Sequence, residues 1–312
     1  MLSRRSALGL GLHLGVGLGL GAATRRAHAA GPLPVVASFS ILADLVRDVG
    51  GSRVSVASVV PVGTELHSFQ PRPSDVRGIG SAAVFVINGL GLEGWAERLA
   101  EAAQFKGKGV VATRGVQALR AAHNHGAHGG KEHEHHHGAY DPHAWQDVAN
   151  VRIYVANIRD GLTAADPDGA AAYAAQADAT LRRLDALDQE IRAAIAPIPR
   201  ERRRIVTTHE AFNYYADAYD IDLLAAQGLS PDAEPTPREF AALIAQIKRE
   251  NVRALFLEQS MSPRLMEQLS RETKVRIGGT LYADTLSPPN GPAATYVDLM
   301  RSNTRTIVAA LT

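Results

Sequence analysis

The chain has 312 residues, of which 46% are hydrophobic and 21% are charged. This length is enough for two domains with their own cores, and the composition is typical of a globular protein. The chain contains no cysteine. The sequence therefore excludes disulfides, thiolate zinc sites and a lipid anchor on a cysteine, and any bound metal must be held by nitrogen and oxygen atoms.

The first 29 residues are predicted to be a cleaved export signal. Arg4 and Arg5 precede an apolar run over residues 7–23, and the small residues around Ala29 are typical of a signal-peptidase site. The arginine pair also resembles a twin-arginine signal, with Ala7 in the place usually held by phenylalanine. An uncleaved anchor helix is the alternative, but the run is rich in glycine and short for a membrane span. We therefore predict a periplasmic location.

The charge balance argues against nucleic acid as a partner. The signal holds four arginines and no acidic residue, so its removal leaves 29 of the 33 basic residues against 32 acidic ones. The predicted mature chain is slightly acidic, and it lacks the basic stripe that nucleic-acid binding requires.

Short β-rich runs alternate with helical patterns along the mature chain, which predicts an α/β fold with parallel-type sheets. Four strands are expected in the first half and four in the second. Their predicted ranges are 35–38, 54–60, 84–88, 109–113, 204–209, 223–226, 254–258 and 275–280.

One long helix is predicted between the two halves, over residues 166–196. Asp166 is a suitable N-cap and Pro167 suits the first helical position. Apolar or small residues recur every three or four positions after it, which indicates one buried face about 45 Å long. The sequence thus predicts two α/β lobes, residues 30–165 and 197–312, joined by one rigid helix.

A histidine-rich segment, residues 123–138, interrupts the first predicted lobe. It has almost no bulky apolar residue and cannot form a core, so it is predicted to be a loop. Its histidines are His123, His125, His128, His133, His135, His136 and His137. Two interpretations stay open: secondary, low-affinity zinc capture or sensing by interchangeable imidazoles, or a low-complexity loop without a role.

Two motif matches carry little weight. Gly89, Gly91 and Gly94 fit the G-x-G-x-x-G nucleotide-binding pattern, but the next predicted strand supplies no acidic residue for a ribose. The H-E-x-x-H pattern from His133 to His137 lies in the glycine-bounded segment, where no stable helix is expected to align two imidazoles. Neither motif supports catalysis, and we predict that the chain is not an enzyme.

Only three histidines remain outside the signal and the histidine-rich segment: His67, His143 and His209. His209 ends a predicted strand, Asp284 lies just past the end of another, and His67 lies in the loop after a third. A proline stiffens the approach to His143. The carboxyl ends of strands are where open α/β sheets bind ligands. A lone histidine is more often a packed or surface residue than a ligand, so spacing alone does not establish a site.

Several motifs in the same order make the chain resemble the zinc- and manganese-binding periplasmic proteins of ABC importers. The resemblance covers nearly the whole mature chain and rests on residues 63–75, 88–95, the histidine-rich insert, 141–143, 209–212, 228–235, 255–258 and 282–286. It implies a metal in the cleft between two lobes that one rigid helix joins. The positions that match the family's ligands are His67, His143, His209 and Asp284. Glu65 is an alternative ligand, because some zinc-binding relatives use an acid near the first histidine.

The resemblance implies a carrier that takes Zn²⁺ as its cargo and delivers it to a membrane permease; a monomer is expected. Three imidazoles and one carboxylate favour tetrahedral Zn²⁺ over Mn²⁺, which prefers oxygen-rich sites, while copper or nickel could also bind. A carrier of manganese or another divalent metal is the first alternative. An exported zinc hydrolase or a metal-dependent adhesion module is a more distant one. Asp141, Asp147 and Glu258 are candidate partners for the ring nitrogens of the histidines.

Overall fold

The computed structural model describes residues 31–121, 139–228 and 235–312. The predicted export signal and the histidine-rich segment, with its seven histidines, lie outside the described residues. Residues Pro32–Thr312 belong to one compact unit. None of the helices in the described part of the chain combines the length and the apolar character needed to span a bilayer.

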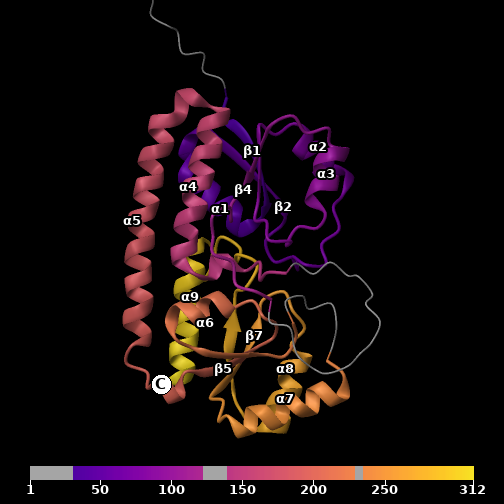
Figure 1. Ribbon diagram of the computed structural model, residues 1–312, viewed down its shortest axis with the longest axis vertical. Coiled ribbons are helices and arrows are strands. Elements are labelled where there is room, and N and C mark those ends of the chain that lie inside the picture. Colours follow the sequence, from indigo (N-terminus) through magenta and orange to yellow (C-terminus); the bar gives the residue numbers. More distant parts are fainter. Residues whose placement is uncertain (1–30, 122–138, 229–234) are drawn as a thin grey trace, which may run out of the picture. The chain divides into compact units, whose positions relative to one another are not determined.

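The N-terminal lobe is built on a parallel sheet in the order β2-β1-β3-β4 (Figure 1). Figure 1 shows α2 and α3 on the other side of these strands from α4. The strands are β1 (Leu33–Phe39), β2 (Val54–Val60), β3 (Val84–Ile87) and β4 (Lys108–Val111), and the helices are α1 (Ser40–Gly50), α2 (Pro73–Gly80), α3 (Ala96–Ala102) and α4 (Val148–Ala165).

The C-terminal lobe repeats this plan with a parallel sheet in the order β6-β5-β7-β8. In both sheets the strand order reverses next to the first strand of the lobe, which leaves a crevice at the carboxyl ends of the strands. The strands are β5 (Arg204–Thr207), β6 (Asp222–Ala225), β7 (Ala254–Glu258) and β8 (Ile277–Leu281), and the helices are α6 (Asn213–Tyr219), α7 (Pro237–Arg249), α8 (Arg264–Thr273) and α9 (Tyr296–Leu311).

A 26-residue helix, α5 (Ala170–Ile195), joins the lobes and packs on α1 and α4 in the first and on α6 and α9 in the second. It begins four residues later than the sequence predicted, because a short 3₁₀ turn, Pro167–Gly169, precedes it. The Asp166 carboxylate does not cap the helix; it accepts hydrogen bonds from Arg53 and from the Tyr173 hydroxyl instead. The buried face of α5 agrees with the predicted apolar pattern and ends, as expected, before Pro197.

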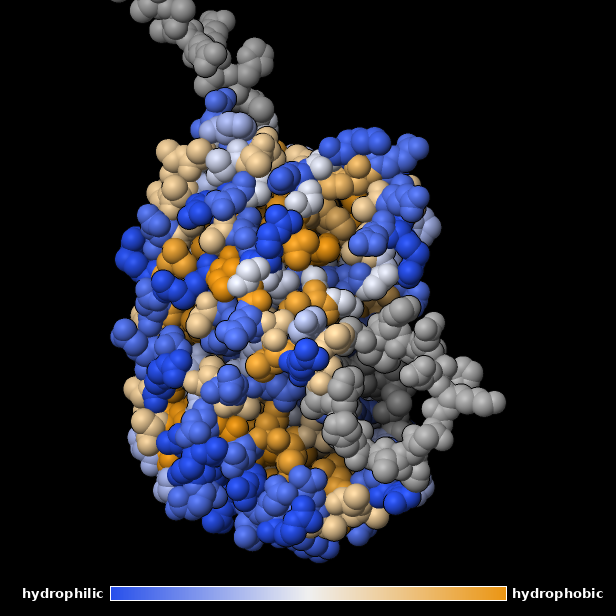
Figure 2. Space-filling model, viewed as in Figure 1, coloured by the Kyte–Doolittle hydropathy of each residue, from blue (hydrophilic) through white to orange (hydrophobic). Residues whose placement is uncertain are grey.

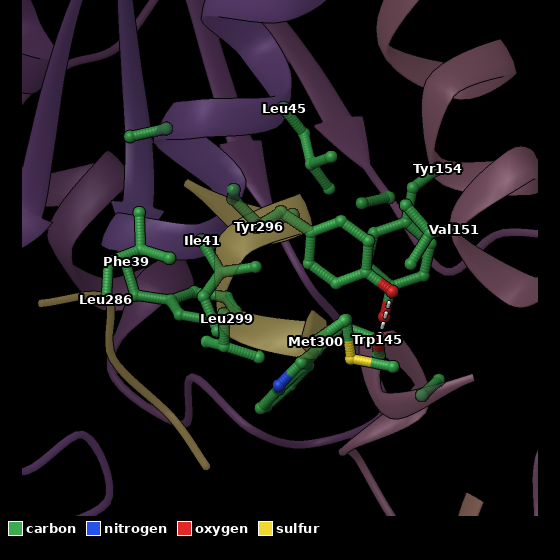
Figure 3. Packing of buried hydrophobic residues seen from close by; sticks show 14 of the residues in the cluster. Phe39, Ile41, Leu45, Trp145, Val151, Tyr154, Leu286, Tyr296, Leu299 and Met300 are labelled. Carbon is green, nitrogen blue, oxygen red and sulfur yellow. Dashed lines mark hydrogen bonds between the residues drawn. The ribbon is translucent and has the colours of Figure 1, made fainter. Parts of the chain in front are cut away.

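The main hydrophobic cluster extends through both lobes. Figure 3 shows Phe39 and Ile41, from β1 and α1, packed near Tyr296, Leu299 and Met300 from α9. The final helix of the chain thus completes a core that the first lobe begins. A smaller cluster lies within the C-terminal lobe, under α7 and α8.

The exterior agrees with this division into core and surface. Figure 2 shows hydrophilic residues over much of one face, with apolar residues in small separate areas. Among the described residues, the exposed large hydrophobic side chains are those of Val62 and Tyr140.

Candidate metal centre

The loops at the carboxyl ends of the strands bring together the four side chains that the sequence singled out. His67 lies in the loop after β2, His209 lies two residues after β5, and Asp284 lies three residues after β8. His143 immediately precedes a short 3₁₀ turn, Ala144–Gln146. One nitrogen or oxygen atom from each of the four side chains lies within 4.8 Å of the other three.

The ligand-type atoms of these side chains face one another at close range. The Nε2 atoms of His67 and His143 are 3.3 Å apart. Oδ2 of Asp284 lies 3.4 Å from Nε2 of both His67 and His209, and its Oδ1 lies 3.7 Å from Nε2 of His143. Three imidazoles and one carboxylate therefore surround a common point.

Two polar atoms at this point are buried without a hydrogen-bond partner among the described residues: Nε2 of His209 and Oδ1 of Asp284. The side chains of His143 and His209 are fully buried, and those of His67 and Asp284 are 8% and 9% exposed. Burying polar atoms without partners is costly, and a bound cation would satisfy both of these.

Two of the histidines each contact a buried carboxylate through Nδ1. Nδ1 of His143 lies 2.8 Å from Oδ1 of Asp141, and Nδ1 of His209 lies 2.5 Å from Oε2 of Glu258. When Nδ1 carries the proton and donates a hydrogen bond to the carboxylate, Nε2 keeps a lone pair that faces the centre. The sequence named both carboxylates, with Asp147, as candidate partners of ring nitrogens, and the structure places Asp141 beside His143 and Glu258 beside His209.

Glu258 also explains why β5 ends earlier than predicted. The strand was expected to run to His209 but ends at Thr207. The backbone amides of Thr208 and His209 leave the ladder and donate to Oε1 of Glu258, at 2.7 and 3.0 Å. One carboxylate thus fixes both the backbone and the ring of His209.

The charges at the centre shift the protonation of its members in opposite directions. Burial alone would lower the pKa of His209, but the carboxylates of Glu258 and Asp284 outweigh it and raise the pKa of His209 well above its ordinary value. Burial opposes ionisation of Asp284, yet the neighbouring imidazoles, His209 foremost, hold its pKa well below its ordinary value. In the metal-free protein, the site therefore favours a carboxylate beside an imidazolium.

Two residues that the sequence considered have other contacts. The Glu65 carboxylate turns onto its own loop, where it accepts hydrogen bonds from the backbone amides of His67 and Ser68 at 2.8 and 2.6 Å. Glu65 is not a member of the converging group. Asp147 caps α4 by accepting a hydrogen bond from the amide of Ala149, so it orients a helix and not an imidazole.

The glycine motif after β3 forms a turn that is linked by hydrogen bonds to the residue before His143. Gly89 has φ +92° and Gly91 has φ +85°, which gives a tight turn that brings Glu93 back under the strand end. Glu93 accepts hydrogen bonds from the backbone amides of Asn88 and Gly89, and the Asn88 side chain donates to the carbonyl of Pro142, next to His143. This role of Glu93 was not predicted from the sequence, although an acidic residue just after a G-x-G turn is a signal for it.

The architecture and the centre together define a class: a binding protein with two α/β lobes and a metal-ligand set between them. A family model described as "Zinc-uptake complex component A periplasmic" matches residues 35–310. The chain is 36% identical to the manganese-binding lipoprotein MntA of Halalkalibacterium halodurans, over 89% of this chain and 88% of that protein.

Solved structures agree with this assignment. The Mn-bound periplasmic metal-binding protein of Candidatus Liberibacter asiaticus, solved as a single-residue variant, superposes with a TM-score of 0.80 at 29% identity. The periplasmic zinc-binding protein TroA of Treponema pallidum has a TM-score of 0.80 at 27% identity. Each covers 90% of this chain and 100% of the solved one.

The chain belongs to the zinc-uptake component A family of periplasmic substrate-binding proteins. It is a metal-binding component of an ABC importer, and the members of this family are binding proteins, not enzymes.

Proposed function

We propose that the chain captures one Zn²⁺ ion in the cleft, through His67, His143, His209 and Asp284, and delivers it to a membrane permease. The observation that carries the proposal is the spacing of the ligand atoms. In a tetrahedral site with bonds of about 2.0–2.1 Å, neighbouring ligand atoms lie about 3.3–3.4 Å apart. Three of the separations at this centre are 3.3, 3.4 and 3.4 Å, and the fourth, from Nε2 of His143 to Oδ1 of Asp284, is 3.7 Å.

Manganese is the second candidate cargo. It is supported by the manganese-binding relative and by the Mn-bound solved structure. The donor set favours zinc, since Mn²⁺ prefers more oxygen ligands and a higher coordination number, and an imidazole-rich site ranks Zn²⁺ above Mn²⁺. The proposed preference for zinc over manganese therefore rests on the ligand set of three imidazoles and one carboxylate.

Metal analysis tests this proposal. The purified mature protein should contain about one zinc per chain, and competition calorimetry should show Zn²⁺ displacing Mn²⁺. Tighter binding of Mn²⁺ than of Zn²⁺ would reverse the assignment of the cargo.

The fourth ligand is tested by a matched pair of variants. Asp284→Asn should weaken zinc binding by about tenfold or more, because it removes the only anionic ligand, whereas Glu65→Gln should change it much less. Calorimetry on both variants measures the difference. Equal losses of zinc affinity in the two variants would indicate that Glu65 is also a ligand.

We propose that residues 1–29 direct export to the periplasm, where the chain meets its permease as a monomer.

The histidine-rich segment is proposed to bind additional zinc. Deleting residues 123–137 should leave the cleft affinity unchanged and lower the total number of zinc ions bound, as measured by titration. An unchanged total would remove metal capture from the roles of this segment.

A further inference from the structure

We propose that Trp145 and Gln146 form a clamp that sets the position of Asp284 against His143 and thereby sharpens the preference for zinc. The clamp is a pair of hydrogen bonds to one atom. Nε1 of Trp145 and Nε2 of Gln146 both donate to the carbonyl oxygen of Ala283, each at 2.9 Å. Both donors come from the segment after His143, and the acceptor lies one residue before Asp284.

The donor side of the clamp is rigid. Trp145 and Gln146 are fully buried. The backbone amide of Gln146 donates to the carbonyl of His143 at 3.1 Å, and the indole packs 5.2 Å from the His143 ring. The Tyr296 hydroxyl donates to the carbonyl of Trp145 at 2.8 Å, a bond drawn in Figure 3. The donors therefore move together with His143.

The acceptor side belongs to the other lobe. Ala283 and Asp284 follow β8, and the carbonyl of Ala283 is one peptide away from the Asp284 side chain. A single carbonyl oxygen has two lone pairs, and here two donors from one segment occupy both. The backbone at Asp284 cannot move away from His143 unless both hydrogen bonds lengthen, so the clamp limits the separation of this ligand pair before a metal arrives.

A fixed separation favours the ion whose coordination it fits. Nε2 of His143 and Oδ1 of Asp284 are already 3.7 Å apart, somewhat wider than the spacing of a tetrahedral site. Further separation should therefore harm Zn²⁺ more than Mn²⁺, whose higher coordination number accommodates a wider range of ligand separations. Trp145 and Gln146 are thus positioning residues that act through Asp284. This inference rests on the proposed cleft site.

Gln146→Leu is the primary test. The amide oxygen of Gln146 makes no hydrogen bond among the described residues, so the substitution removes only the clamp bond of that side chain. The zinc-over-manganese ratio of dissociation constants should fall about tenfold, as for other groups that orient metal ligands. Bound Co²⁺ should lose part of the strong visible absorption that marks a tetrahedral site.

Two further variants keep the test decisive. Trp145→Phe removes the other donor and keeps an aromatic ring, so it should shift the metal ratio in the same direction if Gln146→Leu fails to fold. Asn157→Leu is the control, because Asn157 donates to the carbonyls of Ala112 and Arg114, away from the cleft. It should lower stability without changing the ratio or the cobalt spectrum.

An unchanged ratio and cobalt spectrum in a folded Gln146→Leu or Trp145→Phe protein would overturn the clamp. Failure of the proposed site itself looks different: His143→Ala would then bind zinc as tightly as the wild-type protein does, whatever the clamp variants do.

Discussion

The region around His143 and His209 and the loop that carries His67 supply the same kind of ligand in different ways. The first two rings are fully buried, and a carboxylate holds Nδ1 of each. The loop after β2 exposes Val62, and no hydrogen bond to Nδ1 of His67 is found within the described ranges. The difference indicates that the rings of His143 and His209 are oriented before a metal binds, whereas the ring of His67 is less constrained.

The largest expected effect comes from removing an oriented imidazole. His143→Ala or His209→Ala should weaken zinc binding by a factor of about a hundred or more, because a four-ligand structural zinc site has an apparent binding free energy of about 10–16 kcal/mol to divide among its ligands. His67→Ala should cost about tenfold, since water can replace a less constrained ligand. Calorimetry with a competing chelator measures all three, and equal losses would remove the distinction between the two regions.

A smaller effect is expected from the carboxylate behind His209. Glu258→Gln should lower zinc affinity by about tenfold, because the neutral amide orients and polarises the ring less well. Ser68→Ala, in the loop that carries His67, is the control and should change the affinity by less than about twofold. If Glu258→Gln changed zinc affinity no more than Ser68→Ala does, Glu258 would stabilise the fold without contributing to zinc binding.

The smallest effect appears in the pH dependence of binding. Because the pKa of His209 is raised well above its ordinary value, the metal-free imidazole keeps its second proton to higher pH, and zinc must displace that proton. Zinc affinity should therefore rise with pH until the pKa of His209 is passed, and fall as pH decreases. Calorimetry in buffers of different ionisation enthalpy should detect proton release at pH 7, and less of it in Glu258→Gln. An equal proton release in both proteins would show that the released proton does not come from His209.

The sequence predicted much of this molecule because its strongest signals are local. The strand at 54–60 and the strand at 254–258 have the predicted bounds, since β-rich runs between turns need no distant partner to be recognised. Asp166 and the end of β5 were misplaced because contacts with Arg53 and Glu258, far away in the sequence, decide them. The clamp on Ala283 could not be predicted at all, because residues 137 positions apart form it.

Helix α9 belongs to the core of both lobes. Tyr296, Leu299 and Met300 lie in the cluster that also contains Phe39 and Ile41. The first lobe therefore cannot bury its apolar surface fully without α9, and the two lobes should melt together in one cooperative transition. Loss of α9 should leave the early part of the chain exposed to proteases even though every strand of its own sheet is present.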